Sequence, residues 1–274
     1  KQKADLTLKK IIETSGQLEI PELHQFFKKI GSPKIKESSI SKRDLTAVIR
    51  DIQMGQEHEV GFSIKSKLGG DSTLFNSGGD ATNFKYVVHG YKELTLAEIE
   101  HLNHLKAKSL VSELKAKGCS LEALSNLTLI DSKLDIIIAK ILELYYSSKK
   151  RYLLELIEII EGLDPCGFYS KSPKAKAQKY YHYKIKQFLS AAALGMTARR
   201  PWSGEFDASG GYIIVKDDGE LVCYHIYNWN LFQRYLLNNT YLDTPGTSKH
   251  SFGHLEESEK GTYLKLNLQI RFKP

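Results

Sequence analysis

Asp44 and Lys65 are the two residues whose types and spacing could do chemistry together. The chain from Asp44 to Lys67 reads as a hairpin, because two β-branched runs of strand length flank a polar break that contains Gly55. Side chains alternate along a strand, so Ser63 and Lys65 share one face of the second strand. Antiparallel pairing then returns the end of that strand to Asp44, where the first strand begins.

A carboxylate and an amine held together in this way suit phosphodiester hydrolysis. The carboxylate of Asp44 is a hard oxygen ligand for Mg²⁺, and the backbone carbonyl of Ile64 could supply another. The metal would lower the pKa of a bound water. Lys65 could orient that water or offset charge in the transition state. Taken alone the pair is a weak signal, since most Asp and Lys side chains near a strand end are solvated.

Two helices and a basic loop are expected before the hairpin. Residues 4–14 and 21–30 have apolar side chains at helical spacing, and Pro21 suits a helix start. Residues 32–43 form a serine-rich loop with four basic side chains, Lys34, Lys36, Lys42 and Arg43. The loop is either a solvated linker, which we favour slightly, or a phosphate-contacting approach to Asp44.

A third strand is expected at residues 84–88, packed against the hairpin. Asn76 and Asn83 would then lie at the catalytic end of the sheet, where they contact DNA or bond their own turns.

Residues 95–162 read as several helices, with a capping box at Thr95 and Glu98 and a helix break near Ser120. Their apolar stripes indicate core or dimer contacts rather than a cofactor site. A basic, tyrosine-rich helix follows at residues 172–194.

The C-terminal third is expected to be rich in β structure. Residues 212–227 form a hairpin around an Asp-Gly turn. Residues 264–273 then alternate apolar and polar side chains along one strand. Its polar face includes Gln269 and Arg271, which is either a solvated face or one that contacts base edges.

Composition bounds the possibilities. The chain has 274 residues and a net charge of +7, which favours a polyanionic partner. The three scattered cysteines indicate free thiols in a reducing cytoplasm. The sequence has no apolar run long enough to span a membrane. We also expect no signal peptide at its start. The chain begins with Lys rather than Met, so we expect that some upstream sequence lies outside it.

Long runs of the chain resemble a known family. Residues 61–69, 73–76 and 82–86, and later 202–215, 223–228 and 265–272, resemble the HpaII family of type II restriction endonucleases, which is similar to the wider PD-(D/E)XK nuclease group. The resemblance covers most of the chain from Asp44 onward. It implies Mg²⁺-dependent, sequence-specific cleavage of double-stranded DNA at a short GC-rich palindrome such as CCGG, by a dimer or by a monomer.

The family pattern implies a metal ligand at Asp44 and a catalytic lysine at Lys65. The acidic residue expected two positions before the lysine is Ser63 here. Its place could be taken by Glu59, by the hydroxyl with a backbone carbonyl and water, or by an N-terminal carboxylate. The N-terminal candidates are Glu13, Glu19 and Glu22.

The sequence therefore predicts an α/β protein with a restriction-endonuclease-like mixed sheet core flanked by helices. Its expected parts are 1–94 with the catalytic hairpin, a helical middle at 95–195, and a β-rich recognition part at 196–274. The candidate DNA contacts are Lys67, Asn76, Asn83, Arg199, Arg200, Asn228, Asn230, Lys249, His250, Gln269 and Arg271. A catalytically inactive DNA-binding module, in which Ser63 marks loss of the acid, is the main alternative, and an RNA-binding protein is a weaker one.

Overall fold

The computed structural model describes most of the chain after residue 40. The described residues are 41–67, 71–78, 82–124, 133–170, 177–198, 202–246 and 250–273, except 52, 54 and 217, together with 25 and 29. The helices predicted at 4–14 and 21–30 thus lie almost wholly outside the described residues. The chain divides into two compact units, each described here by itself. Unit 1 is Lys1–Ser72, Phe206–Tyr227 and Pro274, and unit 2 is Thr73–Glu205 and Asn228–Lys273.

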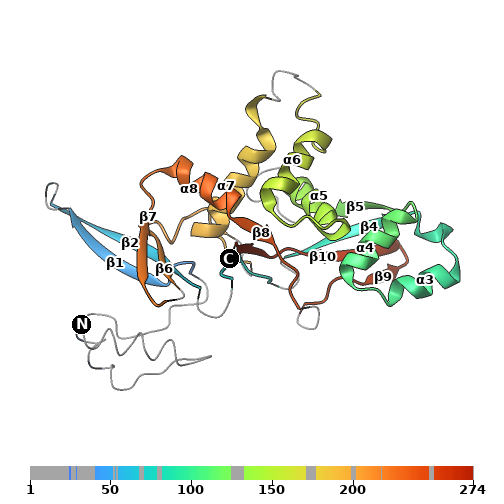
Figure 1. The fold of residues 1–274 in the computed structure, drawn as a ribbon, viewed down its shortest axis with the longest axis horizontal. Helices are drawn as coiled ribbons and strands as arrows, with labels where there is room; N and C mark the ends of the chain where they lie inside the picture. The colour runs from blue at the N-terminus through green and yellow to red at the C-terminus, as the bar shows by residue number, and fades with distance from the viewer. Residues whose placement is uncertain are drawn as a thin grey trace. The chain divides into compact units, whose positions relative to one another are not determined.

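Unit 1 contains a mixed four-stranded sheet made from two hairpins that are distant in sequence. Its strands, in spatial order, are β1 (Leu45–Asp51), β2 (Gln56–Ser66), β6 (Gly211–Val215) and β7 (Leu221–His225). Both predicted hairpins form, and they are joined by parallel pairing of β2 with β6. In Figure 1 the blue β1 and β2 accordingly lie beside the orange β6 and β7.

Unit 2 contains two antiparallel sheets. The first has the order β5 (Ser120–Leu124), β4 (Asn83–His89), β10 (Gly261–Asn267) and β9 (Leu255–Ser258). The second has the order β3 (Thr73–Phe75), β11 (Ile270–Phe272) and β8 (Thr240–Leu242). Strands from both ends of the chain therefore share sheets. The division into the parts 1–94, 95–195 and 196–274 stays a prediction.

The helices whose bounds the structure describes belong to unit 2. They are the 3-10 helix η3 (Tyr91–Glu93) and α3 (Leu96–Asn103), α4 (Ala107–Ala116), α5 (Leu134–Ser147), α6 (Leu153–Leu163), α7 (Tyr180–Leu194) and α8 (Trp229–Asn238). The predicted capping box forms at the start of α3, where Thr95 and Glu98 bond each other's backbone amides. The mixed sheet and these helices confirm the predicted α/β class.

The strand expected at residues 84–88 forms as part of β4, but its predicted packing against the hairpin is wrong. Strand β6 pairs with β2 instead, while β4 pairs with β5 and β10 in unit 2. Strand β5 also replaces the helix restart expected near Ser120. A backbone at the edge of β4 offers Ser120–Leu124 a full ladder of five pairs, which outweighs its weak local helix preference.

The single strand expected at residues 264–273 is in fact two strands in different sheets. β10 ends at Asn267 and β11 begins at Ile270, with a register shift next to it. The predicted apolar face is buried, but Asn267 and Gln269 on the other face are buried too, at 0% and 5% exposed. Amide hydrogen bonds compensate this burial: Asn267 donates to Thr82 at 3.0 Å and to Asn83 at 2.6 Å.

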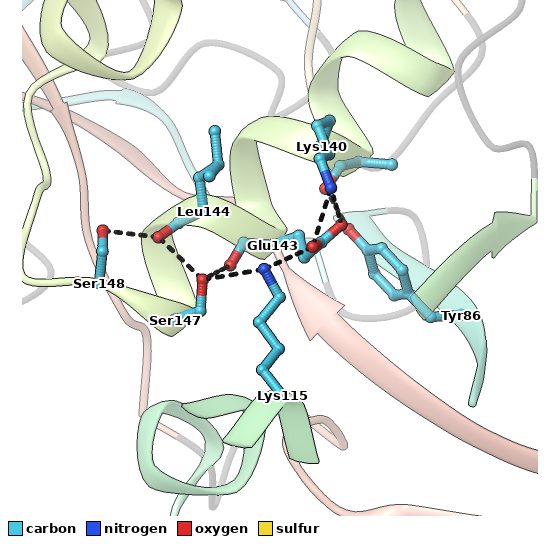
Figure 2. Close-up of polar contacts among 8 residues, drawn as sticks. Tyr86, Lys115, Lys140, Glu143, Leu144, Ser147 and Ser148 are labelled. Atoms are coloured by element: carbon cyan, nitrogen blue, oxygen red, sulfur yellow. Dashed lines mark hydrogen bonds and ion pairs between the residues drawn. The ribbon is translucent and has the colours of Figure 1, made fainter. Parts of the chain in front are cut away.

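The core of unit 2 also contains a charged group, Glu143 on α5, which is 5% exposed. Figure 2 shows its carboxylate between two ammonium groups, with Lys115 at 2.6 Å and Lys140 at 2.9 Å. Burial raises the pKa of the neighbouring Tyr86, and the charge of Glu143 raises it further. Lys115 lies on α4, so the cluster joins two helices through one carboxylate.

We expect Glu143→Ala to lower the free energy of unfolding by about 1–3 kcal/mol. The substitution leaves two ammonium groups beside a cavity, although their partial exposure reduces the cost below that of a fully buried pair. Urea unfolding followed by circular dichroism measures the change. The control is Glu122→Ala, because Glu122 pairs with His89 at an exposed site and should cost under about 1 kcal/mol. Equal losses in both variants would contradict the expectation.

Candidate active site

The register of the first hairpin places Asp44 beside Ser63. Leu45 pairs with Phe62, and the backbone amide of Asp44 donates to the carbonyl of Phe62 at 2.7 Å. Asp44, the residue before β1, therefore lies across from Ser63. The predicted return of the second strand to Asp44 is what the structure shows.

The Asp44 carboxylate is held by β2. Its Oδ2 accepts a hydrogen bond from the Ser63 hydroxyl at 3.1 Å and another from the Ile64 amide at 2.6 Å. Ser63 is 1% exposed, whereas Asp44 is exposed. The hydroxyl at the expected position of the acid thus orients the carboxylate instead of adding a second one.

Lys65 lies on the same face of β2, two residues after Ser63. Its ammonium is 5.8 Å from the centre of the Tyr212 ring on β6, which is 4% exposed. Burial lowers the pKa of Lys65, and the nearby charge of Asp44 opposes that shift. Lys65 is partly withdrawn from water, where the local dielectric constant is lower. Its attraction to a bound anion is therefore stronger than it would be in bulk water.

The segment before Asp44 crosses this face of β2. The amide of Lys42 donates to Oδ2 of Asp207 at 3.1 Å, and the Ser41 hydroxyl donates to the same oxygen at 3.4 Å. Gly61 makes the approach possible, because a Cβ there would lie 2.0 Å from the carbonyl oxygen of Asp207 and 3.0 Å from the Arg43 side chain. Strand β2 is thereby covered at Gly61 by two segments that are far apart in sequence.

Lys42 adds a second amine to the site. Its pKa is lowered to about 7, first by burial and then by the charge of Lys65, while Asp44 opposes the shift. In the sequence, Lys42 belongs to the loop interpreted as a solvated linker, and Asp207 is not among the candidate residues. Only the two-residue distance from Lys42 to Asp44 was visible in the sequence; no local pattern relates residue 42 to residue 207.

Within the described residues, none of the acids expected to replace the missing one lies free beside Asp44. Glu59 is paired with Arg43 at 2.7 Å, and Glu13, Glu19 and Glu22 lie outside the described residues. The described part of the chain holds no cluster of three His, Cys, Asp or Glu side chains. Among the described residues, Asp44 is therefore the carboxylate that the Ser63 hydroxyl and the Ile64 amide hold, while Asp207 accepts from Ser41 and Lys42. One carboxylate still fits Mg²⁺, which keeps several waters and needs few protein ligands.

The predicted DNA contacts divide by exposure. Three of them, Arg199, Arg200 and Lys249, lie outside the described residues. The exposed ones are Lys67, Asn76, Asn228 and Asn230, and His250 is half-buried. The side chain of Asn228 accepts from the amide of Leu231 at 3.0 Å and so caps α8.

The remaining three predicted contacts are engaged inside unit 2. Asn83 is 6% exposed and donates to the carbonyl of Ser251 at 3.0 Å. Gln269 donates to the side chain of Asn76 at 3.1 Å, and Arg271 pairs with Asp243 at 2.7 Å. The sequence pattern could not reveal this, because base-reading amides and core amides are the same residue types.

Comparison with known proteins decides the family. The model of the HpaII restriction endonuclease family matches residues 1–272. The chain belongs to the HpaII restriction endonuclease family. It is 42% identical to the type II restriction enzyme HpaII of Haemophilus parainfluenzae over 99% of this chain and 76% of that enzyme. No solved structure matches the chain significantly.

As a member of the HpaII family, the chain is a type II site-specific deoxyribonuclease that acts on DNA. This confirms the predicted enzyme class. Type II restriction endonucleases generally use a divalent metal ion. Among the described residues, none of the helices is long and apolar enough to cross a bilayer.

Proposed function

We propose that Asp44, Ser63 and Lys65 form the hydrolytic site and that the enzyme cleaves double-stranded DNA with Mg²⁺ as its cofactor. The observation that carries this is the carboxylate of Asp44, held by Ser63 and Ile64 next to a lysine on the same strand face. A carboxylate that can bind a metal ion and an amine that can bind a phosphate are the groups that phosphodiester hydrolysis requires. Asp44 is exposed to an incoming ligand.

Each group has a separate role in this proposal. The Asp44 carboxylate and the Ile64 carbonyl would hold Mg²⁺, which when bound lowers the pKa of a water and neutralises phosphate charge. Ser63 keeps the carboxylate in place. Lys65 binds a phosphate oxygen and orients the water, whose oxygen forms a bond to phosphorus as the bond to the leaving oxygen breaks.

The proposed target is a short GC-rich palindrome, CCGG, as the family resemblance implies. The exposed Lys67 suits phosphate, and Asn76, Asn230 and the half-buried His250 suit polar contacts to DNA. Arginine and lysine side chains make the bidentate or direct contacts to guanine O6 and N7, and these are assigned to Arg199, Arg200, Lys249 and Arg271.

Candidate residues whose side chains already bond within the protein are proposed to support DNA recognition indirectly. Gln269 holds Asn76, Asn83 holds the chain at Ser251, and Asn228 caps α8. These bonds would position DNA-contacting neighbours, so the three amide side chains act on recognition through the residues that they fix. A two-fold dimer suits a palindromic site, and the working place is proposed to be the cytoplasm of a bacterium or archaeon.

Incubation with DNA of known sequence that contains CCGG sites tests the proposal. With Mg²⁺ we expect discrete fragments whose ends all map to CCGG, and with excess chelator we expect none. DNA without CCGG serves as the control. Fragment ends at another sequence would overturn the target, and DNA that is retarded in a gel but never cut, at any divalent metal tried, would overturn the hydrolytic assignment.

A further inference from the structure

The segment Ser41–Lys42–Arg43 is fixed at three points over the face of β2 that carries Ser63 and Lys65. The Lys42 amide donates to Asp207 at 3.1 Å on one side. Arg43 pairs with Glu59 at 2.7 Å, and Glu59 lies on the same strand face as Gly61. Three residues after Lys42, at Leu45, the chain enters β1. The backbone of Lys42 is therefore placed by the fold and does not depend on its own side chain.

This placement gathers three charges at one end of the sheet. The ammonium groups of Lys42 and Lys65 act on each other electrostatically, and both act on the Asp44 carboxylate. Two amines thus lie beside the carboxylate that is proposed to hold the metal. An anionic phosphate bound at Asp44 through that metal would be attracted by both amines.

The loop that holds Lys42 belongs to the same site. Asp207 lies three residues before Gly210, whose amide donates to the carbonyl of Gly61 at 2.7 Å. The loop then enters β6, which carries Tyr212 beside Lys65. Asp207 therefore connects the segment of Lys42 to the two strands that carry Lys65 and its aromatic neighbour.

We propose that Lys42 is a further active-site residue that binds the scissile phosphate together with Lys65, and that Asp207 is the positioning residue that holds it there. The ligand class is a phosphodiester, whose charge grows in the transition state. This inference rests on the proposed function, because it places the reacting phosphate next to Asp44 and Lys65.

The salt dependence of DNA binding is the first test. Binding of a CCGG duplex is measured without divalent metal, so that no cleavage occurs, at several salt concentrations. We expect Lys42→Met to reduce the slope of log K against log salt by about 0.9, the value for one lost phosphate contact. Lys42→Arg keeps the charge and should keep the slope. Lys216→Met is the matched control, because Lys216 is paired with Glu220 at the turn between β6 and β7.

Cleavage rates complete the test. With Mg²⁺ and saturating enzyme, Lys42→Met should cut roughly 100-fold more slowly, as expected for loss of one group that stabilises charge in the transition state. A reduced slope with a wild-type cleavage rate would mean that Lys42 contacts another phosphate and would overturn the inference. An unchanged slope would overturn it as well. If Lys42→Met does not fold, Lys42→Gln, a polar side chain without charge, takes its place in both measurements.

Asp207→Asn tests the positioning role. We expect roughly 10-fold slower cleavage with little change in apparent DNA affinity. In the Lys42→Met background, the same substitution should have no further effect, because it acts through Lys42. Multiplicative losses in the double variant would show that Asp207 acts independently and would remove its assigned role.

These outcomes are separable from failure of the proposed function. If Lys65→Met cuts DNA as fast as the wild type, the hydrolytic assignment fails. The salt slope of Lys42→Met is measured without cleavage, so it reports the phosphate contact in either case.

Discussion

Lys65→Met should slow DNA cleavage by roughly 1,000-fold while DNA binding stays within a few-fold of the wild type. Removing a group that meets charge developed in the transition state costs about 100- to 1,000-fold, and Lys65 lies next to the carboxylate that would hold the metal. Because the ground-state duplex is held by many other contacts, affinity should change little. Single-turnover cleavage of a CCGG duplex and a gel-shift titration measure the two quantities.

The matched comparisons for this result come from the same sheet. Asp44→Asn keeps the shape of the side chain but removes its charge, so it should lose cleavage to a similar extent. Lys216→Met at the far turn of β6 and β7 should cut normally. Wild-type cleavage by Lys65→Met, or loss of DNA binding in proportion to the loss of cleavage, would refute the assigned role of Lys65.

Gly61→Ala should disrupt the site although it removes no functional group. The added Cβ would lie 2.0 Å from the carbonyl oxygen of Asp207, and a backbone atom at that distance cannot move aside at low cost. Forcing an extra carbon into a packed contact costs about 1–3 kcal/mol of folding stability. Because the displaced segments carry Asp207 and Arg43, cleavage should fall as well, by roughly 10-fold or more.

The same substitution at Gly162 is the control for Gly61→Ala. Gly162 lies in α6, and a Cβ there meets nothing within 4 Å. Since alanine is the better helix former, Gly162→Ala should leave cleavage unchanged and stabilise the chain by about 0.5–1 kcal/mol. Thermal unfolding and single-turnover cleavage are measured for both variants. A Gly61→Ala enzyme as stable and active as Gly162→Ala would contradict the close approach of Asp207.

Several features followed from local sequence. The alternation and polar break between Asp44 and Lys67 were enough to predict the first hairpin, because strand pairing between neighbouring segments and side-chain alternation are short-range rules. Its register, with Leu45 opposite Phe62, came from the structure. The capping box at Thr95 and the hairpin around the Asp-Gly turn were predicted for the same reason. The family was also visible, since its matching runs are long and extend over most of the chain.

Other features were decided by contacts between distant segments. Sequence could not tell that β6 rather than β4 pairs with β2, because many apolar strands compete for one edge and only the whole fold selects among them. It could not tell that Gln269 is buried and bonded to Asn76 instead of exposed.

The candidate site shows the same division. The sequence by itself was enough to propose Asp44, Ser63 and Lys65, since side-chain alternation puts Ser63 and Lys65 on one strand face and the predicted hairpin returns them to Asp44. Tertiary structure alone brought Asp207 to Lys42, across more than half of the sequence. The physical reason is that a hydrogen bond between distant segments depends on where the sheet closes, which no local pattern of residues encodes.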